Sequence, residues 1–181
     1  MKKAANKNIR RRIFALRISV VGQLLCLCLC VIAAQASFAA SPLLHKQAPE
    51  FVRLDLQNRK LDLRAYRGKV VLLDFWATWC APCMAEMPRF MAWQKQYGPS
   101  GLQVIGISMD DDPAPVRKLY EKLKLNYPVV MGDEKLGELY GGVMGLPVTF
   151  LLDRNGRIQE QFTGETDLNA MEGKLKALLH P

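Results

Sequence analysis

The sequence predicts an α/β fold in which a mixed β-sheet lies between helices. Three observations lead to this prediction. Short apolar runs rich in Val and Leu alternate with helix-patterned segments, Gly and Pro separate them, and a strand–turn–strand pattern precedes the last helix. The 181 residues are 50% hydrophobic and 23% charged, enough for one such domain with an appendage. This composition excludes a disordered tail protein and a fibrous chain.

The first 40 residues are predicted to be a targeting segment. Basic residues are followed by an apolar run over residues 18–34 and by small residues that offer cleavage after Ala36 or Ala39. The alternative is an uncleaved N-terminal membrane anchor, because about 17 apolar residues is the lower limit for a spanning helix. Either way, residues 41–181 form the predicted domain, exported to the periplasm as a soluble protein or anchored to the inner membrane.

The positive charge of the chain does not predict nucleic-acid binding. Of its 25 Lys and Arg residues, seven precede residue 41, where there is no acidic residue, so 18 remain against 17 Asp and Glu in the domain. A protein that binds nucleic acid needs a basic face on the folded domain itself. We therefore expect no nucleic-acid partner.

The domain is predicted to begin with a β-hairpin, because apolar and polar residues alternate over 51–56 and 61–64 with a polar turn between. The apolar run 69–75 follows Gly68 and has the length and composition of a central strand that is buried on both faces. The later segments are predicted as helix 82–97, strand 102–108, helix 115–125, strand 127–131, helix 133–140, a hairpin of strands 147–153 and 158–162, and helix 167–179.

The domain contains two cysteines, Cys80 and Cys83, in the motif Trp79-Cys-Ala-Pro-Cys83. A structural zinc site needs about four ligands, and the only histidines, His45 and His180, lie near the two ends of the domain. We therefore expect no metal and no bound cofactor other than a redox-active disulfide between the two cysteines.

The spacing of the pair favours a redox role over a structural one. A structural crosslink stabilises mainly by closing a long loop of the unfolded chain, and this one would enclose only two residues. The pair lies where the predicted central strand turns into a helix, and the helix N-terminus favours a thiolate. We expect Cys80 to attack a partner disulfide and Cys83 to resolve the mixed disulfide.

Two carboxylates are candidate proton-transfer groups. Asp74 interrupts the apolar run of the predicted central strand and should be largely buried, which is costly for a lone carboxylate. The alternative for Asp74 is a solvated strand-edge residue or a satisfied structural hydrogen bond. Glu86 lies one helical turn beyond Cys83, on the same helix face. Its alternative is a first-turn acid that complements the helix dipole.

Pro147 begins a predicted strand in the segment Gly145-Leu-Pro-Val-Thr149. A cis peptide bond there would leave backbone groups for pairing with an incoming extended peptide. The residues themselves do not determine the isomer, and X–Pro bonds in folded proteins are mostly trans.

The stretches 70–88 (VVLLDFWATWCAPCMAEMP) and 145–157 (GLPVTFLLDRNGR) together resemble the TlpA/ResA-type exported branch of the thioredoxin superfamily. The resemblance covers Ala48 to the C-terminus. It implies a thioredoxin fold with an N-terminal β-hairpin and a central insertion near residues 110–140. It also implies that Cys80 is the nucleophile, Cys83 the resolving thiol and Glu86 the tuning acid, with Pro147 in cis.

Asp74 departs from this branch, which often has a neutral residue at that position. Two acids are therefore expected to share the proton transfer, with coupled titrations. Trp79, Pro82 and Leu146 flank the motif residues and are the expected substrate-binding positions.

The resemblance implies a thiol-disulfide oxidoreductase that reduces specific protein clients, such as apocytochrome c or the cysteines of copper-delivery proteins. The absence of a histidine between Cys80 and Cys83 favours a reductant, which in an oxidising compartment needs a membrane electron donor. One alternative is a metal-delivery module that binds Cu(I) through the two thiolates. Another is peroxide reduction by Cys80, although no Pro-x-x-x-Thr-x-x-Cys segment is present.

Overall fold

The computed structural model describes residues 43–180. The predicted targeting segment and its cleavage sites lie outside these residues, so the proposed boundary at residue 40 stays a prediction. Among the described residues, no helix combines the length and the apolar character that crossing a membrane requires.

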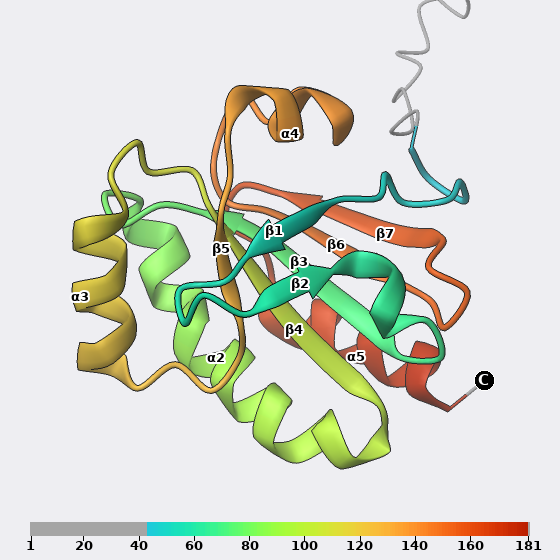
Figure 1. The fold of residues 1–181 in the computed structure, drawn as a ribbon. Coiled ribbons are helices and arrows are strands. Elements are labelled where there is room, and N and C mark those ends of the chain that lie inside the picture. Colours follow the sequence, from blue (N-terminus) through green and yellow to red (C-terminus); the bar gives the residue numbers. More distant parts are fainter. Residues whose placement is uncertain (1–42, 181) are drawn as a thin grey trace, which may run out of the picture. The chain divides into compact units, whose positions relative to one another are not determined.

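A five-stranded mixed sheet forms the centre of the domain. Its strands are β3 (Val70–Trp76), β4 (Leu102–Ser108), β5 (Val129–Met131), β6 (Val148–Leu152) and β7 (Ile158–Thr163). They lie in the order β5-β4-β3-β6-β7 (Figure 1), so the strand predicted to be central is central. β3 pairs in parallel with β4 and antiparallel with β6, and the predicted hairpin of β6 and β7 is confirmed.

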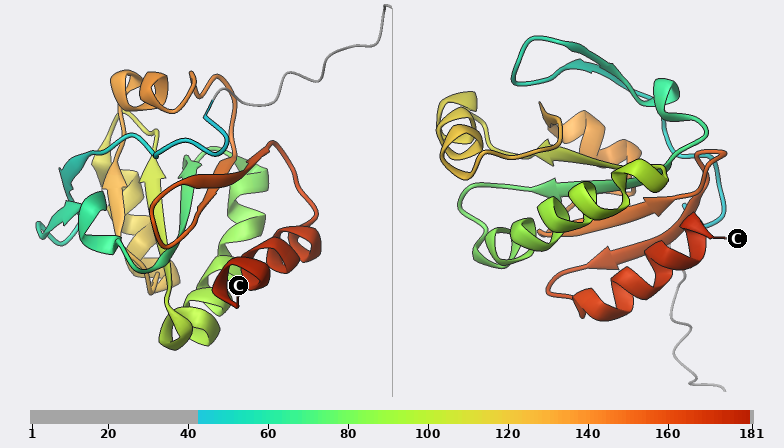
Figure 2. Two further views of the ribbon diagram at one scale, coloured as in Figure 1. Left: turned by 90° about the vertical axis from the view of Figure 1, so that its right-hand side faces the viewer. Right: turned by 90° about the horizontal axis from the view of Figure 1, so that it is seen from below.

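Helices cover both faces of the sheet, as Figure 2 shows. One face carries α2 (Ala81–Tyr97), α3 (Pro113–Leu123) and α5 (Leu168–Leu179), and the other carries the short α4 (Glu134–Leu139) and the N-terminal segment. Side chains of β3 alternate between the two cores: Leu72 and Trp76 pack on the α2 side, and Leu73 on the other. By this alternation Asp74 belongs to the α2 side.

The N-terminal hairpin consists of β1 (Val52–Leu54) and β2 (Lys60–Asp62), paired antiparallel. The prediction of a strand over 61–64 is wrong at its end, because residues 63–66 form a 3₁₀ helix, η1 (Leu63–Tyr66). The Asp62 side chain accepts a hydrogen bond from the Arg64 N–H and caps this turn, which gives the chain a local alternative to strand pairing.

Residues 110–140, the expected central insertion, contain α3, β5 and α4. Each of these helices begins at an aspartate: Asp112 accepts from the Ala114 N–H and Asp133 from the Leu136 N–H. β5 then adds to the edge of β4 in parallel, so this segment extends the sheet beyond the central strands. A second 3₁₀ turn, η2 (Gly98–Ser100), links α2 to β4.

Candidate active site at the cysteine pair

Cys80 and Cys83 form a disulfide at the start of α2, with an S–S distance of 2.01 Å. Cys80 is the N-cap of the helix, in an extended backbone conformation, and its Sγ accepts a hydrogen bond from the Cys83 N–H at 3.3 Å. Pro82 occupies the first turn, where a missing N–H costs no helix hydrogen bond. The sulfur of Cys80 therefore lies among the unpaired donors of a helix N-terminus, which favour a thiolate.

The two sulfurs differ in their access to solvent. Cys80 keeps 5% of its surface exposed and Cys83 1%. Trp79, immediately before the pair, is 71% exposed, and Pro82 is half-buried. An incoming group therefore meets Trp79 and Cys80 first, while Cys83 is sheltered behind them.

Asp74 lies inside the core, with 1% of its surface exposed. The alternative of a solvated strand-edge residue is therefore wrong. The only hydrogen bond of its carboxyl group among the described residues is a long one, 3.4 Å, donated by the Thr149 hydroxyl to Oδ1. The pKa of Asp74 is raised from its usual 3.8 to about 8. Burial is the largest cause, the charge of Glu86 contributes to the rise, and the Thr149 hydrogen bond opposes it.

Glu86 is also buried, with 4% of its surface exposed. Both of its carboxylate oxygens lack a hydrogen-bond partner among the described residues. Glu86 also lies beyond the first turn of α2, so the alternative of a first-turn acid that complements the helix dipole is wrong. Burial raises the pKa of Glu86 to about 7. The nearby Thr166 amide opposes this rise without reaching hydrogen-bond geometry, and the charge of Glu165 adds to it.

The Leu146–Pro147 peptide bond is cis, as the resemblance implied. Pro147 is buried, and Leu146 is half-buried between the two cores. The Pro147 carbonyl already accepts a hydrogen bond from the Gly164 N–H at 2.8 Å. This carbonyl is therefore engaged within the domain and is not free to pair with an incoming peptide.

Asp110 ties the cysteine loop to the end of β4 and was not among the predicted site residues. Its carboxylate accepts hydrogen bonds from the Thr78 N–H at 2.9 Å, from the Thr78 hydroxyl and from the Ser108 hydroxyl at 2.8 Å. The sequence could have predicted Asp110 as a site residue, because it comes just after a predicted strand and the carboxyl ends of parallel strands meet at one edge of a sheet.

Two further polar groups are buried on the α2 side of the sheet, where Asp74 also lies. The Trp76 Nε1 and the Tyr127 hydroxyl have no hydrogen-bond partner among the described residues. Burial, and then the charge of Asp74, raise the pKa of Tyr127. Gly106 pairs directly with Asp74 across the sheet, and a Cβ there would come within 2.9 Å of Trp76 Nε1. The local sequence could not predict that Asp74, Gly106 and Trp76 lie close together, because their positions depend on the register between β3 and β4.

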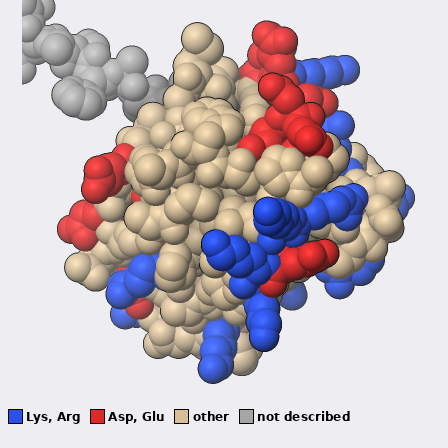
Figure 3. All heavy atoms as spheres, turned by 90° about the vertical axis from the view of Figure 1, so that its left-hand side faces the viewer, with Lys and Arg blue, Asp and Glu red and all other residues tan. Residues whose placement is uncertain are grey.

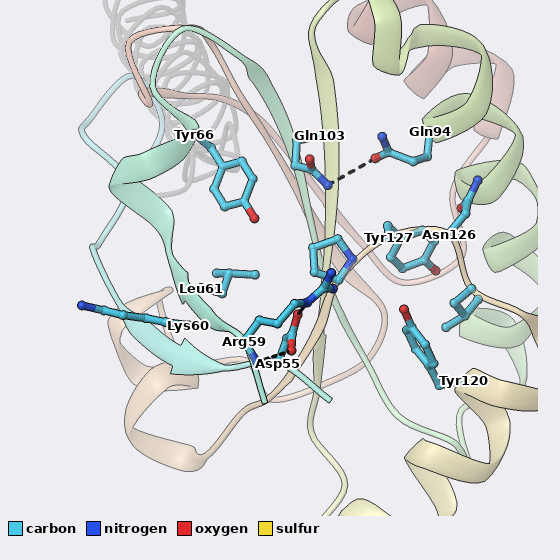
Figure 4. Close-up of a pocket in the computed structure, with 12 residues that line it drawn as sticks. Asp55, Arg59, Lys60, Leu61, Tyr66, Gln94, Gln103, Tyr120, Asn126 and Tyr127 are labelled. Atoms are coloured by element: carbon cyan, nitrogen blue, oxygen red, sulfur yellow. Dashed lines mark hydrogen bonds and ion pairs between the residues drawn. The ribbon is translucent and has the colours of Figure 1, made fainter. Parts of the chain in front are cut away.

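A polar cavity of about 560 Å³ lies away from the cysteines, between the N-terminal hairpin and the chain that enters β5. Figure 4 shows the hydroxyls of Tyr120 and Tyr127 facing one another across one part of it, and the ion pair of Arg59 with Asp55 across another. No cysteine lines it. Among the described residues no group of three or more His, Cys, Asp or Glu is arranged to hold a metal ion.

Comparisons with known proteins agree with this geometry. Residues 44–161 match the AhpC/TSA family. The thiol-disulfide oxidoreductase ResA of Bacillus anthracis is 36% identical over 135 residues, which cover 74% of this chain and 77% of ResA. ResA of Geobacillus thermodenitrificans (strain NG80-2) is 38% identical over 117 residues, covering 65% of this chain and 67% of that protein.

Solved structures show the same fold. A Chlorobium tepidum protein described as a thiol:disulfide interchange protein DsbE superposes with a TM-score of 0.69 at 32% identity, covering 74% of this chain and 95% of that one. The pneumococcal exposed lipoprotein thioredoxin Etrx1 from Streptococcus pneumoniae (strain TIGR4) gives 0.63 at 28% identity, covering 72% and 100%. The chain therefore belongs to the AhpC/TSA family and is a ResA-like thiol-disulfide oxidoreductase with a thioredoxin fold.

Proposed function

We propose that this oxidoreductase reduces disulfides of specific protein clients through Cys80 and Cys83, outside the cytoplasmic membrane. The observation that carries the proposal is the position of Cys80. It caps the N-terminus of α2, its Sγ accepts the Cys83 N–H, and it is the more exposed of the two cysteines.

The reaction starts from the dithiol. The Cys80 thiolate attacks one sulfur of the client disulfide, and the other client sulfur leaves as a thiolate that takes up a proton. Cys83 then loses its proton and attacks Cys80 Sγ. The Cys80–Cys83 disulfide closes, and the second client thiol is released. Two electrons and two protons have passed to the client. We propose that a membrane protein with a dithiol then reduces the Cys80–Cys83 disulfide and so restores the starting dithiol.

Glu86 and Asp74 are the proposed proton acceptors for Cys83. Both are buried on the α2 side of the sheet, and both have a pKa raised by burial toward neutrality. A base whose pKa is near the working pH combines a useful deprotonated fraction with enough basicity to remove a proton. The charge of Glu86 contributes to raising the pKa of Asp74, which supports the proposal that the two acids titrate as a coupled pair.

Reduction is favoured over oxidation by the residues between the cysteines, Ala81 and Pro82, which add no positive charge to stabilise the thiolate further. The reduction potential tests this. Equilibration with glutathione buffers is expected to give a value nearer to the roughly −270 mV of thioredoxin than to the roughly −120 mV of a strong oxidant. A value at the oxidant end would reverse the proposed direction.

The proposed clients are apocytochrome c or cysteine pairs of copper-delivery proteins, and the proposed site of action is the periplasm. Trapping identifies the client. With Cys83→Ser, the second step is blocked, so a disulfide between Cys80 and the client is expected to accumulate in cells and to disappear on treatment with dithiothreitol.

The matched control is the double variant Cys80→Ser/Cys83→Ser, which lacks the nucleophile and should trap nothing. Client identity is read by mass spectrometry of the adducts. If the single variant accumulates no more adducts than the double variant, the mechanism through Cys80 is wrong.

A further inference from the structure

A groove of about 640 Å³ lies at the carboxyl ends of β4 and β5, beside the cysteine loop. Its walls come from the segments that follow these strands and from residues 143–144, which precede the cis proline. Figure 3 shows the left-hand side of the molecule as drawn in Figure 1, where a broad uncharged area has a group of acidic side chains at its upper right and basic side chains below them.

The groove is connected to the disulfide through Asp110. This residue lies in the groove wall and accepts hydrogen bonds from the backbone and hydroxyl of Thr78. Thr78 is two residues before Cys80, so their Cα atoms are at most about 7.6 Å apart. Met144, on the other wall, is three residues before Pro147. A client segment held in the groove would therefore be within a few residues of the cysteine that Cys80 attacks.

The apolar part of the groove consists mainly of thioether side chains. Met109, Met131 and Met144 line it together with Val143. Met144 is 97% exposed, more than any other large apolar side chain of residues 43–180. Met109 packs against Gly132, where a Cβ would lie 2.6 Å from its Sδ, so glycine is needed for this packing. Flexible, polarisable methionines suit a surface that accepts varied apolar side chains.

The charged part of the groove is entirely acidic. Its charged lining residues are Asp110, Asp111, Asp133 and Glu134. Arg53 pairs with Asp133 at 2.6 Å, and Asp110 is engaged by the cysteine loop. Asp111 and Glu134 are exposed and form no ion pair among the described residues. Negative charge is thus left over for a partner.

We propose that this groove selects clients, taking a protein segment that presents an apolar side chain next to a Lys or Arg beside the disulfide to be reduced. The inference rests on the proposed function and adds its substrate class. The apolar side chain packs against Met109, Met131 and Met144, and the cation lies against Asp111 and Glu134. The attraction acts on binding, so it affects KM rather than the sulfur chemistry.

The test uses two synthetic peptides that carry the same internal disulfide, one flanked by Leu-Lys and the other by Leu-Glu. Reduction by the purified protein is followed with a dithiol regenerating system. The Leu-Lys peptide is expected to have a kcat/KM about tenfold higher at low salt, through KM, with the difference shrinking in 0.5 M NaCl because the charges are exposed.

The double variant Asp111→Lys/Glu134→Lys should reverse this preference, and Met144→Ser should raise KM for both peptides. Glu121→Lys, an exposed charge reversal on α3 outside the groove, is the matched control. The proposal is overturned if the groove variants and the control show the same peptide preference as the wild type. Hydroxyethyl disulfide is small and uncharged, so its reduction tests the proposed disulfide reductase function separately from the proposed role of the groove. All variants should reduce it equally, and failure of the wild type to do so would count against the proposed function instead.

Discussion

The carboxyl of Asp74 is held in an environment that favours its neutral form. It is buried on the α2 side of the sheet, and its hydrogen bond from Thr149 is long. Burial of a carboxylate without strong partners costs free energy in the charged state only. The side chain therefore places a pH-dependent cost on folding, and a stability measurement can detect it.

Replacing Asp74 by Asn should make the protein more stable at alkaline pH. The pKa of Asp74 in the folded state, about 8, lies above its usual 3.8, so the folded state binds more protons between these values and wild-type stability falls as pH rises through them. The full difference amounts to at most roughly 6 kcal/mol. Urea denaturation of the oxidised protein from pH 4 to pH 9 measures it.

Asp111→Asn removes one negative charge from the exposed surface and serves as the control. The Asp74→Asn curve should separate from both the control and the wild type progressively as pH rises. Parallel curves for all three proteins across the whole pH range would contradict the assigned burial cost.

Glu86→Gln should slow the second step of the reaction by about tenfold near pH 7, because a buried acceptor for the Cys83 proton is lost. It should also lower the pKa of Asp74, since the Glu86 charge contributes to raising it. Single-turnover kinetics report the rate, and carboxyl ¹³C NMR of Asp74 reports the titration. Glu165→Gln is the control. It should lower the pKa of Glu86, because the charge of Glu165 contributes to raising it, while the Glu86 carboxyl itself stays in place. An unchanged Asp74 titration in Glu86→Gln would show that the two acids are not coupled.

Single residues were predictable from the sequence where one local pattern was decisive. A carboxylate inside a run of Val and Leu predicted the burial of Asp74, and the helical repeat placed Glu86 on the same face as Cys83. Their neighbours Thr149 and Tyr127 were not predictable. Thr149 faces Asp74 through the antiparallel register of β3 and β6, and Tyr127 lies beside Asp74 by tertiary packing. Neither arrangement is encoded within a short stretch of chain.

At the scale of elements, the strong periodic segments were predicted well and the weakly patterned ones less well. β4 has the predicted bounds, and α2 and β3 differ from prediction by one residue at one or both ends. The segment 61–64 alternates like a strand, yet its second half is helical because Asp62 caps η1. A local side-chain hydrogen bond prevailed there over apolar alternation.

Gly106→Ala should destabilise the domain by about 1 to 3 kcal/mol, because it overpacks the middle of β4. An added Cβ would lie 2.9 Å from Trp76 Nε1 and 3.1 Å from Val129 Cγ2, and both side chains are fully buried.

Gly173→Ala should have the opposite effect on stability. Gly173 lies on the exposed side of α5 with open space around it, so alanine should stabilise by up to about 1 kcal/mol. Denaturant melts of both variants give the comparison, and equal effects would refute the packing argument.

The whole domain depends on its N-terminal segment to complete one of its two cores. Phe51, Leu61 and Leu63 belong to the same buried cluster as Phe75 and Phe150 of the central sheet. The Leu56 N–H also donates to the Val129 carbonyl, which ties the segment to β5. Without these contacts the sheet would be covered by helices on one face and only partly on the other, so the hairpin is part of the core rather than an attachment to it.

Phe51→Ala should therefore cost the domain about 3 to 5 kcal/mol. Phe51 is buried and packs edge-on against Tyr140, with ring centroids 6.5 Å apart, and Tyr140 in turn donates a hydrogen bond to the Pro49 carbonyl at 2.7 Å. Val52→Ala, at the next and exposed position, should change stability by less than about 0.5 kcal/mol. If the hairpin is integral, Phe51→Ala unfolds in one transition at lower denaturant, and fluorescence and circular dichroism report the same midpoint. An early loss of the hairpin alone, followed by unfolding at the wild-type midpoint, would mean that the central sheet is stable without it.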